Sequence, residues 1–195
     1  MSFHLVQCDD VTPQPWKNGG GVTRELLAWP TAANWLVRIS VADIEKDGPF
    51  SAFPGIKRTI TVLSGTGIWL DEPVNVLLKP KYPPYTFSGD LTPHCDLIRG
   101  PTRDLNAMFN ESEGSGRLRR WRSGYESRLK WWRLELMGDP PSVCGVFTLG
   151  AATLRTYRET LEMPPMSLAW VEGPLLDMQL LASPQAWAFH YTLRQ

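Results

Sequence analysis

The residue with the clearest chemical potential is Arg58, which lies near the start of an alternating apolar segment. Within GPFSAFPGIKRTITVLSGTGIWLD, residues 48–71, Arg58 shares one face of a predicted strand with Ile60 and Val62. Burying an arginine on an apolar face costs free energy unless the guanidinium reaches water or meets an anion. A guanidinium can hold a carboxylate through two parallel hydrogen bonds. The position therefore predicts either an anion-binding residue or a surface arginine at the end of a strand.

Other polar residues are candidate helpers of Arg58. In WLVRISVADI, residues 35–44, one face of the predicted strand carries Arg38 among small and polar side chains, which suits either a pocket wall or an exposed face. Asn106 offers a donor and an acceptor, which suits a carboxyl or amide ligand or a turn. With Ser51 added, the predicted ligand-binding set is Arg58, Asn106, Ser51 and Arg38. We assign no catalytic residue because the sequence shows no nucleophile–base pair.

The sequence predicts neither a metal site nor a phosphate loop. His94, Cys95 and Asp96 are ligand types, but neighbouring residues of a strand point to opposite faces, so Cys95 cannot join the other two. The glycine tract of residues 18–21 lacks the Lys-Ser/Thr pair of a phosphate loop and precedes a strand-like segment, so we expect a tight turn. We therefore expect no metal and no cofactor.

Composition and charge narrow the class of protein. The chain has 20 Lys and Arg against 20 Asp and Glu, so no net field favours nucleic acid or an anionic membrane. Three widely spaced cysteines argue against a disulfide framework and fit a reducing compartment. Neither a signal peptide nor a membrane-spanning run is recognisable. We expect a cytoplasmic protein that binds no membrane, with a homodimer as one possible assembly.

A basic and aromatic stretch raises one alternative. Residues 117–133, RLRRWRSGYESRLKWWR, interleave arginines with tryptophans, a pattern typical of single-stranded nucleic-acid binders. These residues also alternate with apolar ones, and acidic residues elsewhere cancel their charge. We therefore expect a solvated sheet edge and no nucleic-acid partner; binding that weakens steeply with salt would indicate the opposite.

The elements that must position these residues are short strands. Runs rich in Val, Ile, Thr, Trp and Leu are separated at short intervals by Gly and Pro, which favours an all-β sandwich or barrel. NESEGSG, residues 110–116, is the least structured segment and predicts a domain boundary. Residues 1–110 are then expected to form a first barrel with the pocket, and residues 111–195 a second barrel that supports it.

The spacing around Arg58 resembles the first motif of the cupin superfamily. In that motif a metal-binding acid stands at a set distance before a turn glycine, with two histidines upstream. Here Gly65 is the turn glycine and Arg58 takes the place of the acid, while no histidine lies between His4 and His94. A site built around this cation should attract anions and repel metal ions.

Longer motifs resemble the HutD/Ves family. They are PWKNGGGVTRELL, VRISVADIEKDGPFSAFPGIKRTITVLSGTGIWL, FSGD and GPTRDLNAMF, which together cover most of residues 13–109. The resemblance implies an all-β bicupin, with two jelly-roll-like β-barrel halves in one chain and no catalytic metal. It also maps the pocket arginine of the family onto Arg58.

The same resemblance implies a role in a catabolic pathway such as histidine utilisation. Such a protein would bind a small carboxylate, with N-formylglutamate or a formate-like carboxylate as candidates, and would limit pathway intermediates without being an enzyme. Two alternatives stay open: a stress-induced relative of Ves type, and a metal-independent isomerase or hydrolase acting on a small carboxylate.

Overall fold

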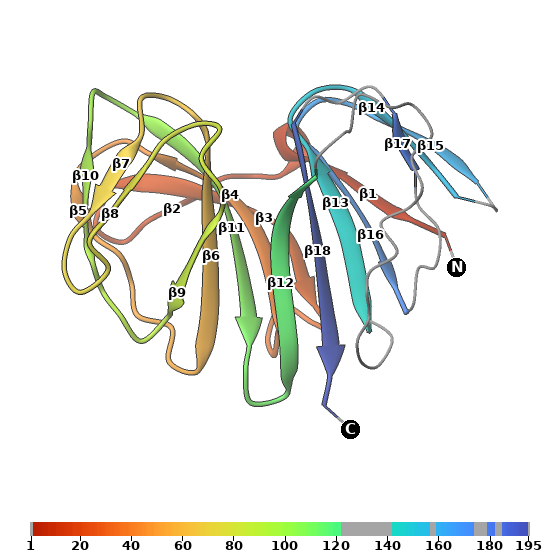
Figure 1. Cartoon of the computed structure of the whole chain (residues 1–195), viewed down its shortest axis with the longest axis horizontal. Helices are drawn as coiled ribbons and strands as arrows, with labels where there is room; N and C mark the ends of the chain where they lie inside the picture. Colours follow the sequence, from red (N-terminus) through yellow and green to blue (C-terminus); the bar gives the residue numbers. More distant parts are fainter. Residues whose placement is uncertain (1, 122–141, 157–158, 174–178, 182–184, 195) are drawn as a thin grey trace. The chain divides into compact units, whose positions relative to one another are not determined.

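The computed structural model describes residues 2–121, 142–156, 159–173, 179–181 and 185–194. Within these ranges every regular element is a β-strand, apart from the short 3-10 helix η1, Cys8–Asp10 (Figure 1). The predicted all-β class is confirmed. The chain divides into two compact units: one is Val11–Arg117, and the other joins Met1–Asp10 to Leu118–Gln195. No helix in the described ranges is long and apolar enough to span a bilayer.

The unit Val11–Arg117 is built around a six-stranded antiparallel sheet. Its central strands alternate small or polar residues with branched apolar ones, as expected for a sheet that carries a polar site on an apolar wall. The order of its strands is β2 (Gln14–Pro15), β3 (Gly21–Trp29), β4 (Val37–Ile44), β11 (Thr102–Asn110), β6 (Ile56–Ser64) and β9 (Tyr85–Ser88).

A second sheet of four short strands completes this unit. Its order is β5 (Gly48–Pro49), β10 (His94–Leu97), β7 (Ile68–Leu70) and β8 (Val76–Leu78). Ile60 and Val62 of β6 share one apolar core with Ile68 and Leu70 of β7, so this core joins the two sheets. Gly65 lies where the chain leaves the larger sheet for the smaller one, and its φ of 94° is a backbone conformation that glycine adopts readily.

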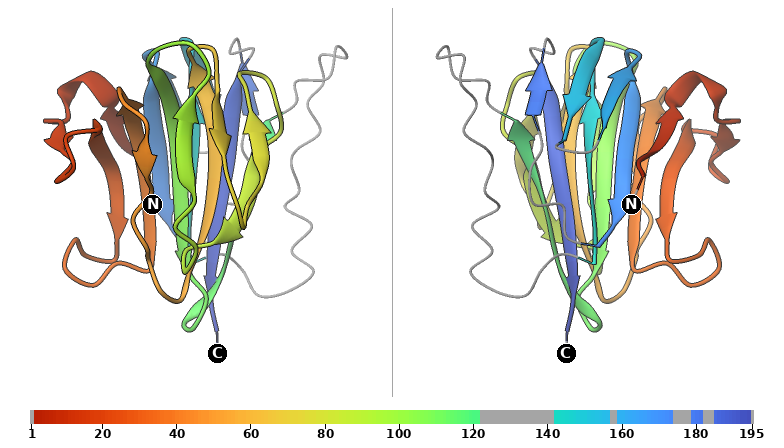
Figure 2. Two further views of the ribbon diagram at one scale, coloured as in Figure 1. Left: turned by 90° about the vertical axis from the view of Figure 1, so that its left-hand side faces the viewer. Right: turned by 90° about the vertical axis from the view of Figure 1, so that its right-hand side faces the viewer.

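The other unit also consists of sheets. A five-stranded sheet has the order β1 (His4–Gln7), β16 (Ser167–Glu172), β13 (Val143–Thr148), β18 (Ala186–Leu193) and β12 (Gly114–Trp121). A three-stranded sheet contains β15 (Thr160–Met163), β14 (Ala152–Arg155) and β17 (Gln179–Leu181). Figure 2 shows the N-terminal segment beside the blue strand β16, with which β1 pairs from His4 to Gln7.

The two units differ from the division expected at residue 110. The first ten residues belong with the C-terminal segment because β1 adds to the edge of β16, and the other limit falls at Arg117, inside β12. Strand pairing between distant parts of the chain leaves no trace in local composition. Of the basic stretch 117–133, the first five residues lie in β12; residues 122–133 lie outside the described residues, so its solvated-edge interpretation stays a prediction.

Candidate functional site

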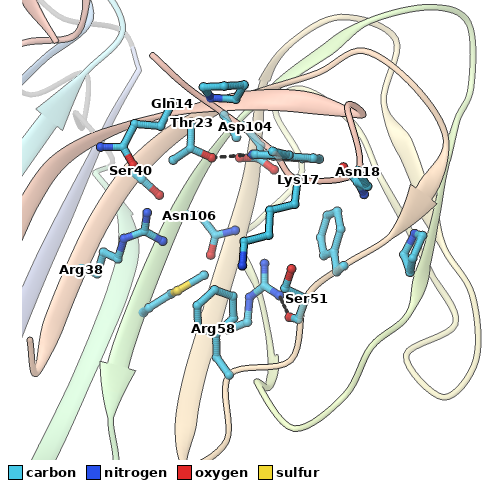
Figure 3. Close-up of a pocket in the computed structure, with 17 residues that line it drawn as sticks. Gln14, Lys17, Asn18, Thr23, Arg38, Ser40, Ser51, Arg58, Asp104 and Asn106 are labelled. Carbon is cyan, nitrogen blue, oxygen red and sulfur yellow. Dashed lines mark hydrogen bonds between the residues drawn. The ribbon is translucent and has the colours of Figure 1, made fainter. Parts of the chain in front are cut away.

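A cavity of about 570 Å³ opens within the unit Val11–Arg117. Its walls come from one face of the six-stranded sheet, from the turn between β2 and β3, and from the segment that follows β5 (Figure 3). The lining residues are Gln14, Pro15, Trp16, Lys17, Asn18, Thr23, Arg38, Ser40, Ala42, Pro49, Phe50, Ser51, Phe53, Arg58, Asp104, Asn106 and Met108.

The antiparallel register arranges the polar residues in rows across the sheet. Met108 of β11 lies between Arg38 of β4 and Arg58 of β6. Two residues earlier on β11, on the same face, Asn106 lies opposite Ser40. The structure thus brings Arg58, Asn106 and Arg38 to one cavity wall. Period-two alternation in the sequence had given only the face of its own strand on which each residue lies.

Arg58 is held in an aromatic cup. Its side chain is buried, with the residue only 4% exposed. The guanidinium carbon lies 5.0, 5.5 and 5.1 Å from the ring centroids of Phe50, Phe53 and Phe87, a geometry in which the rings stabilise the cation. One terminal nitrogen donates a hydrogen bond to the main-chain carbonyl of Ser51 at 3.3 Å, while Nε has no partner. Ser51 therefore positions Arg58 through its backbone.

The charge of Arg58 is incompletely compensated. Burial is the main cause that lowers the pKa of its guanidinium to about 10; the attraction of Asp104 opposes this shift, and the charge of Arg38 adds to it. A group with this pKa is still a cation at neutral pH. Among the residues that the structure describes, no carboxylate forms an ion pair with it. The cavity therefore presents a desolvated cation that an entering anion could contact.

Asp104 is the acid of the cavity. The residue is 1% exposed, accepts a hydrogen bond from the backbone N–H of Ala42, and leaves Oδ1 without a partner. Burial raises the pKa of its carboxyl to about 7; Arg58 opposes this shift and Asp43 adds to it. Both protonation states of Asp104 are therefore populated near neutral pH.

The remaining predicted residues differ in their freedom to bind. Asn106 is 6% exposed and its Oδ1 has no partner, so its amide can serve a ligand. Arg38 is already engaged, because its Nε donates to Oε2 of Glu25 at 2.6 Å. Its charge is largely compensated, so Arg58 is the stronger candidate for an anion contact.

The turn after β2 brings Lys17 to the cavity. Figure 3 shows the Lys17 side chain reaching toward Asn106 and Arg58. The turn is fastened by Trp16, whose indole N–H donates to the hydroxyl of Thr23 at 2.7 Å, and by a positive φ of 65° at Gly19. The expected tight turn is confirmed.

The predicted ligand-binding set included neither Lys17 nor Asp104. For Asp104 a signal existed, since it alternates with Asn106 on β11. For Lys17 there was none, because only the folded turn directs it inward.

The other ligand-type residues lie apart from the cavity. The side chains of His94 and Asp96 are 45% and 52% exposed, with Nε2 and Oδ1 3.5 Å apart, whereas Cys95 is fully buried. Burial raises the pKa of the Cys95 thiol to about 12, which makes it a poor metal ligand. The described ranges contain no group of three His, Cys, Asp or Glu that could hold a metal ion.

One protein-family model and two curated proteins are similar to this chain. The family model HutD matches residues 8–188 of this chain. An uncharacterised 21.2 kDa protein from the hutC 3′ region of Pseudomonas putida is 35% identical over 137 residues, 67% of this chain and 64% of that protein. Protein Ves of Citrobacter koseri is 37% identical over 110 residues, 53% of this chain and 56% of that protein. The matched regions thus span less than two thirds of each relative.

Solved structures resemble the whole chain. HutD from Pseudomonas fluorescens SBW25 superposes with a TM-score of 0.78 and 26% identity, covering 100% of both chains. A cupin 2 conserved barrel domain protein from Leptotrichia buccalis gives a TM-score of 0.53 at 12% identity, with 98% of this chain and 96% of that chain covered. The second likeness shows the fold alone, and that fold is cupin-like.

Proposed function

Because this chain belongs to the HutD family, we propose that it is a metal-free bicupin whose cavity around Arg58 binds a small carboxylate. The observation that carries the proposal is Arg58 itself. It is a buried cation that lines a cavity and has no ion pair with any described residue. Keeping such a cation in a low-dielectric site costs free energy, which an incoming anion would recover.

The shape of the site favours a carboxylate. The guanidinium is planar and presents its donors as a fork, which matches the two oxygens of a carboxylate. The rings of Phe50, Phe53 and Phe87 restrict the orientation of that plane. Lys17 adds a second positive charge at the cavity, and Asn106 adds an amide. The solved structure of HutD from Pseudomonas fluorescens SBW25 carries the designation "Formate condition", and formate is the smallest carboxylate.

We further propose a regulatory role in a catabolic pathway such as histidine utilisation. Its support is the position of one relative in the 3′ region of hutC and the match to HutD. N-formylglutamate and formate-like carboxylates are the candidate ligands. A cytoplasmic location, the absence of nucleic-acid and membrane partners, and a homodimer as one possible assembly stay predictions.

A thermal-shift screen tests the proposal. Small mono- and dicarboxylates, including formate and N-formylglutamate, are each compared with the matching primary amide, which lacks the negative charge. A ligand that binds only the folded state raises its melting temperature, so we expect shifts with carboxylates and none with the amides. If no carboxylate raises the melting temperature, or if the amides act equally, the proposal is wrong.

A second candidate function is a metal-independent enzyme in the same cavity. It is favoured by Asp104, a buried carboxyl whose pKa of about 7 suits general acid–base catalysis. Proton NMR of each carboxylate that binds would distinguish the two. Time-dependent conversion by the wild type, abolished in Asp104→Asn, would favour the enzyme; unchanged spectra would favour the binding protein.

A further inference from the structure

Asp104 and Arg58 line the same cavity, yet no ion pair joins them. The two residues lie on neighbouring strands: Asp104 is opposite Val62, two same-face positions along β6 from Arg58. The Ala42 backbone N–H donates to the Asp104 carboxyl, and Oδ1 of Asp104 is left without a partner. The cavity thus contains a buried cation and a buried carboxyl that form no ion pair with each other.

Of the charged groups around Asp104, Arg58 is the one that stabilises its ionised form. On β4, Asp43 is a carboxylate held by Arg24 and Arg103, and it repels a charge on Asp104. On β10, Cys95 is a neutral thiol at physiological pH.

Farther around the cavity, the charge of Arg38 on β4 is offset by Glu25 on β3. Lys17 lies on the exposed turn, where water screens it. The ionised form of Asp104 therefore depends chiefly on Arg58.

A carboxylate bound at Arg58 makes the ionised form of Asp104 less stable. It offsets the guanidinium charge and adds a negative charge to the cavity that Asp104 lines. Two carboxylates sharing one desolvated site cannot both stay ionised at low cost, so one of them holds a proton. Once protonated, Asp104 also becomes a donor, and its unpartnered Oδ1 can present the O–H to the ligand through rotation about its broad terminal torsion.

We propose that Asp104 takes up a proton from solvent when a carboxylate binds at Arg58, so that the site binds the anion and a proton together. The inference rests on the proposed function of Arg58 and adds a proton-binding residue to it. Anion affinity then depends on pH even though the ligand itself stays ionised. Carboxylates are bound more tightly as the solution becomes more acidic, down to the pH at which Asp104 is already protonated in the empty protein.

The coupling between carboxylate binding and proton uptake by Asp104 can be expressed as protons taken up per ligand and as the change in affinity with pH. At a pH where Asp104 is ionised in the empty protein, binding takes up close to one proton per ligand, and affinity falls about tenfold for each pH unit. At a pH where Asp104 is already protonated, uptake approaches zero and affinity becomes constant. The transition between the two regimes lies near neutral pH, where the carboxyl of the empty protein titrates.

The test is calorimetric titration of formate into the full chain. Titrations in Tris and in HEPES, which differ in heat of ionisation, give the number of protons taken up. We expect uptake of about half a proton at neutral pH, rising toward one proton at pH about 8.5, with affinity falling over the same range. Asp104→Asn should bind formate with no uptake and with an affinity that does not depend on pH. His94→Gln is the matched control, because His94 is another ionisable residue of the unit Val11–Arg117 but lies outside the lining of the cavity, and it should behave as the wild type.

Each outcome decides the inference. Formate binding by the wild type without proton uptake overturns the role of Asp104 and leaves carboxylate binding at Arg58 intact. Absence of formate binding at every pH overturns both. If Asp104→Asn fails to fold, Asp104→Ser and the two-buffer measurement on the wild type still decide the question. Uptake that persists in a folded Asp104 variant, or disappears in His94→Gln, assigns the proton to another group.

Discussion

Arg58 combines a cost in folding with an expected role in binding. Its guanidinium is buried among three phenyl rings, with one hydrogen bond and an unpartnered Nε. An unsatisfied buried donor costs roughly 1–3 kcal/mol. Phenyl rings and a backbone carbonyl offset this only in part. Such an arrangement is expected at a binding site, where the ligand supplies the missing contact.

This cost leads to a prediction about stability. Arg58→Met keeps the stem volume within the aromatic cup and removes the buried charge, so the free energy of unfolding without ligand should stay within about 1 kcal/mol of wild type or rise. Chemical denaturation of both proteins measures the difference. A loss of more than about 3 kcal/mol would mean that the guanidinium is mainly structural.

Asp104 predicts how stability depends on pH. Its pKa is raised by burial to about 7 in the folded state, whereas an unfolded aspartate titrates near 3.9. Between these values the folded state binds a proton that the unfolded state has lost, so its contribution to stability falls as pH rises from about 4 to about 7 and is constant outside this window. Urea denaturation of the ligand-free protein at a series of pH values should show this slope, and Asp104→Asn should flatten it. An identical slope in the variant would contradict the assignment.

The burial of Asp104 was not predictable from the sequence. Alternation along β11 put it on the same face as Asn106, but alternation does not say whether that face meets solvent. By contrast, Arg58 was recognisable, since an arginine in line with Ile60 and Val62 is anomalous on an apolar face. Asp104 lies on a polar face, where an acidic residue is not unusual, so its burial becomes evident only once the opposite wall of the cavity is known.

At the scale of elements, the turn between β2 and β3 fixes the edge of the cavity. Gly21 begins β3, and a Cβ added there would overlap the carbonyl oxygen of Asp43 on β4. The atoms nearest to a Cβ on Gly20 belong to the Asn18 side chain, the first at 3.2 Å, and Gly20 does not have a positive φ. Gly21 therefore has no room for a side chain, whereas a small side chain at Gly20 would require only a movement of Asn18.

The neighbours allow a matched test of the turn. Gly21→Ala must push β3 away from β4, so we expect a loss of roughly 2 kcal/mol or more in unfolding free energy together with weaker carboxylate binding. Gly20→Ala should cost less than about 1 kcal/mol, because a side chain can move. Thermal or chemical denaturation of the two variants and the wild type measures both losses of stability. Equal losses for Gly20→Ala and Gly21→Ala would contradict the prediction.

Strand identities were predictable where alternation was strong. The predicted strands at residues 35–44 and 57–64 correspond to β4, Val37–Ile44, and β6, Ile56–Ser64. The pairing of these strands was not, because neighbours in the sheet can be far apart in sequence. β11 inserts between β4 and β6, and this insertion brings Asn106 and Asp104 beside Arg58. The site is therefore a product of long-range pairing, which a local pattern does not reveal.

At the scale of the whole molecule, the account predicts a protein that works without a metal. The described ranges contain no suitable cluster of ligands, and the cavity presents Arg58 and Lys17, which repel cations. Elemental analysis of the purified protein should show no stoichiometric transition metal, and EDTA should leave carboxylate binding unchanged. A metal bound at one equivalent, whose removal abolishes binding, would contradict this.

The measurement that tests the central claim most directly is calorimetric titration of one carboxylate into wild type, Arg58→Lys and Arg58→Met under identical conditions. The ligand is the carboxylate that gives the largest thermal shift. The account predicts that Arg58→Met weakens binding by about 2–4 kcal/mol, or roughly 30- to 1000-fold, because the charge-assisted contact is lost. Arg58→Lys should recover only part of this, since it keeps the charge and loses the fork. Equal affinity of all three folded proteins would contradict the account and place the ligand elsewhere.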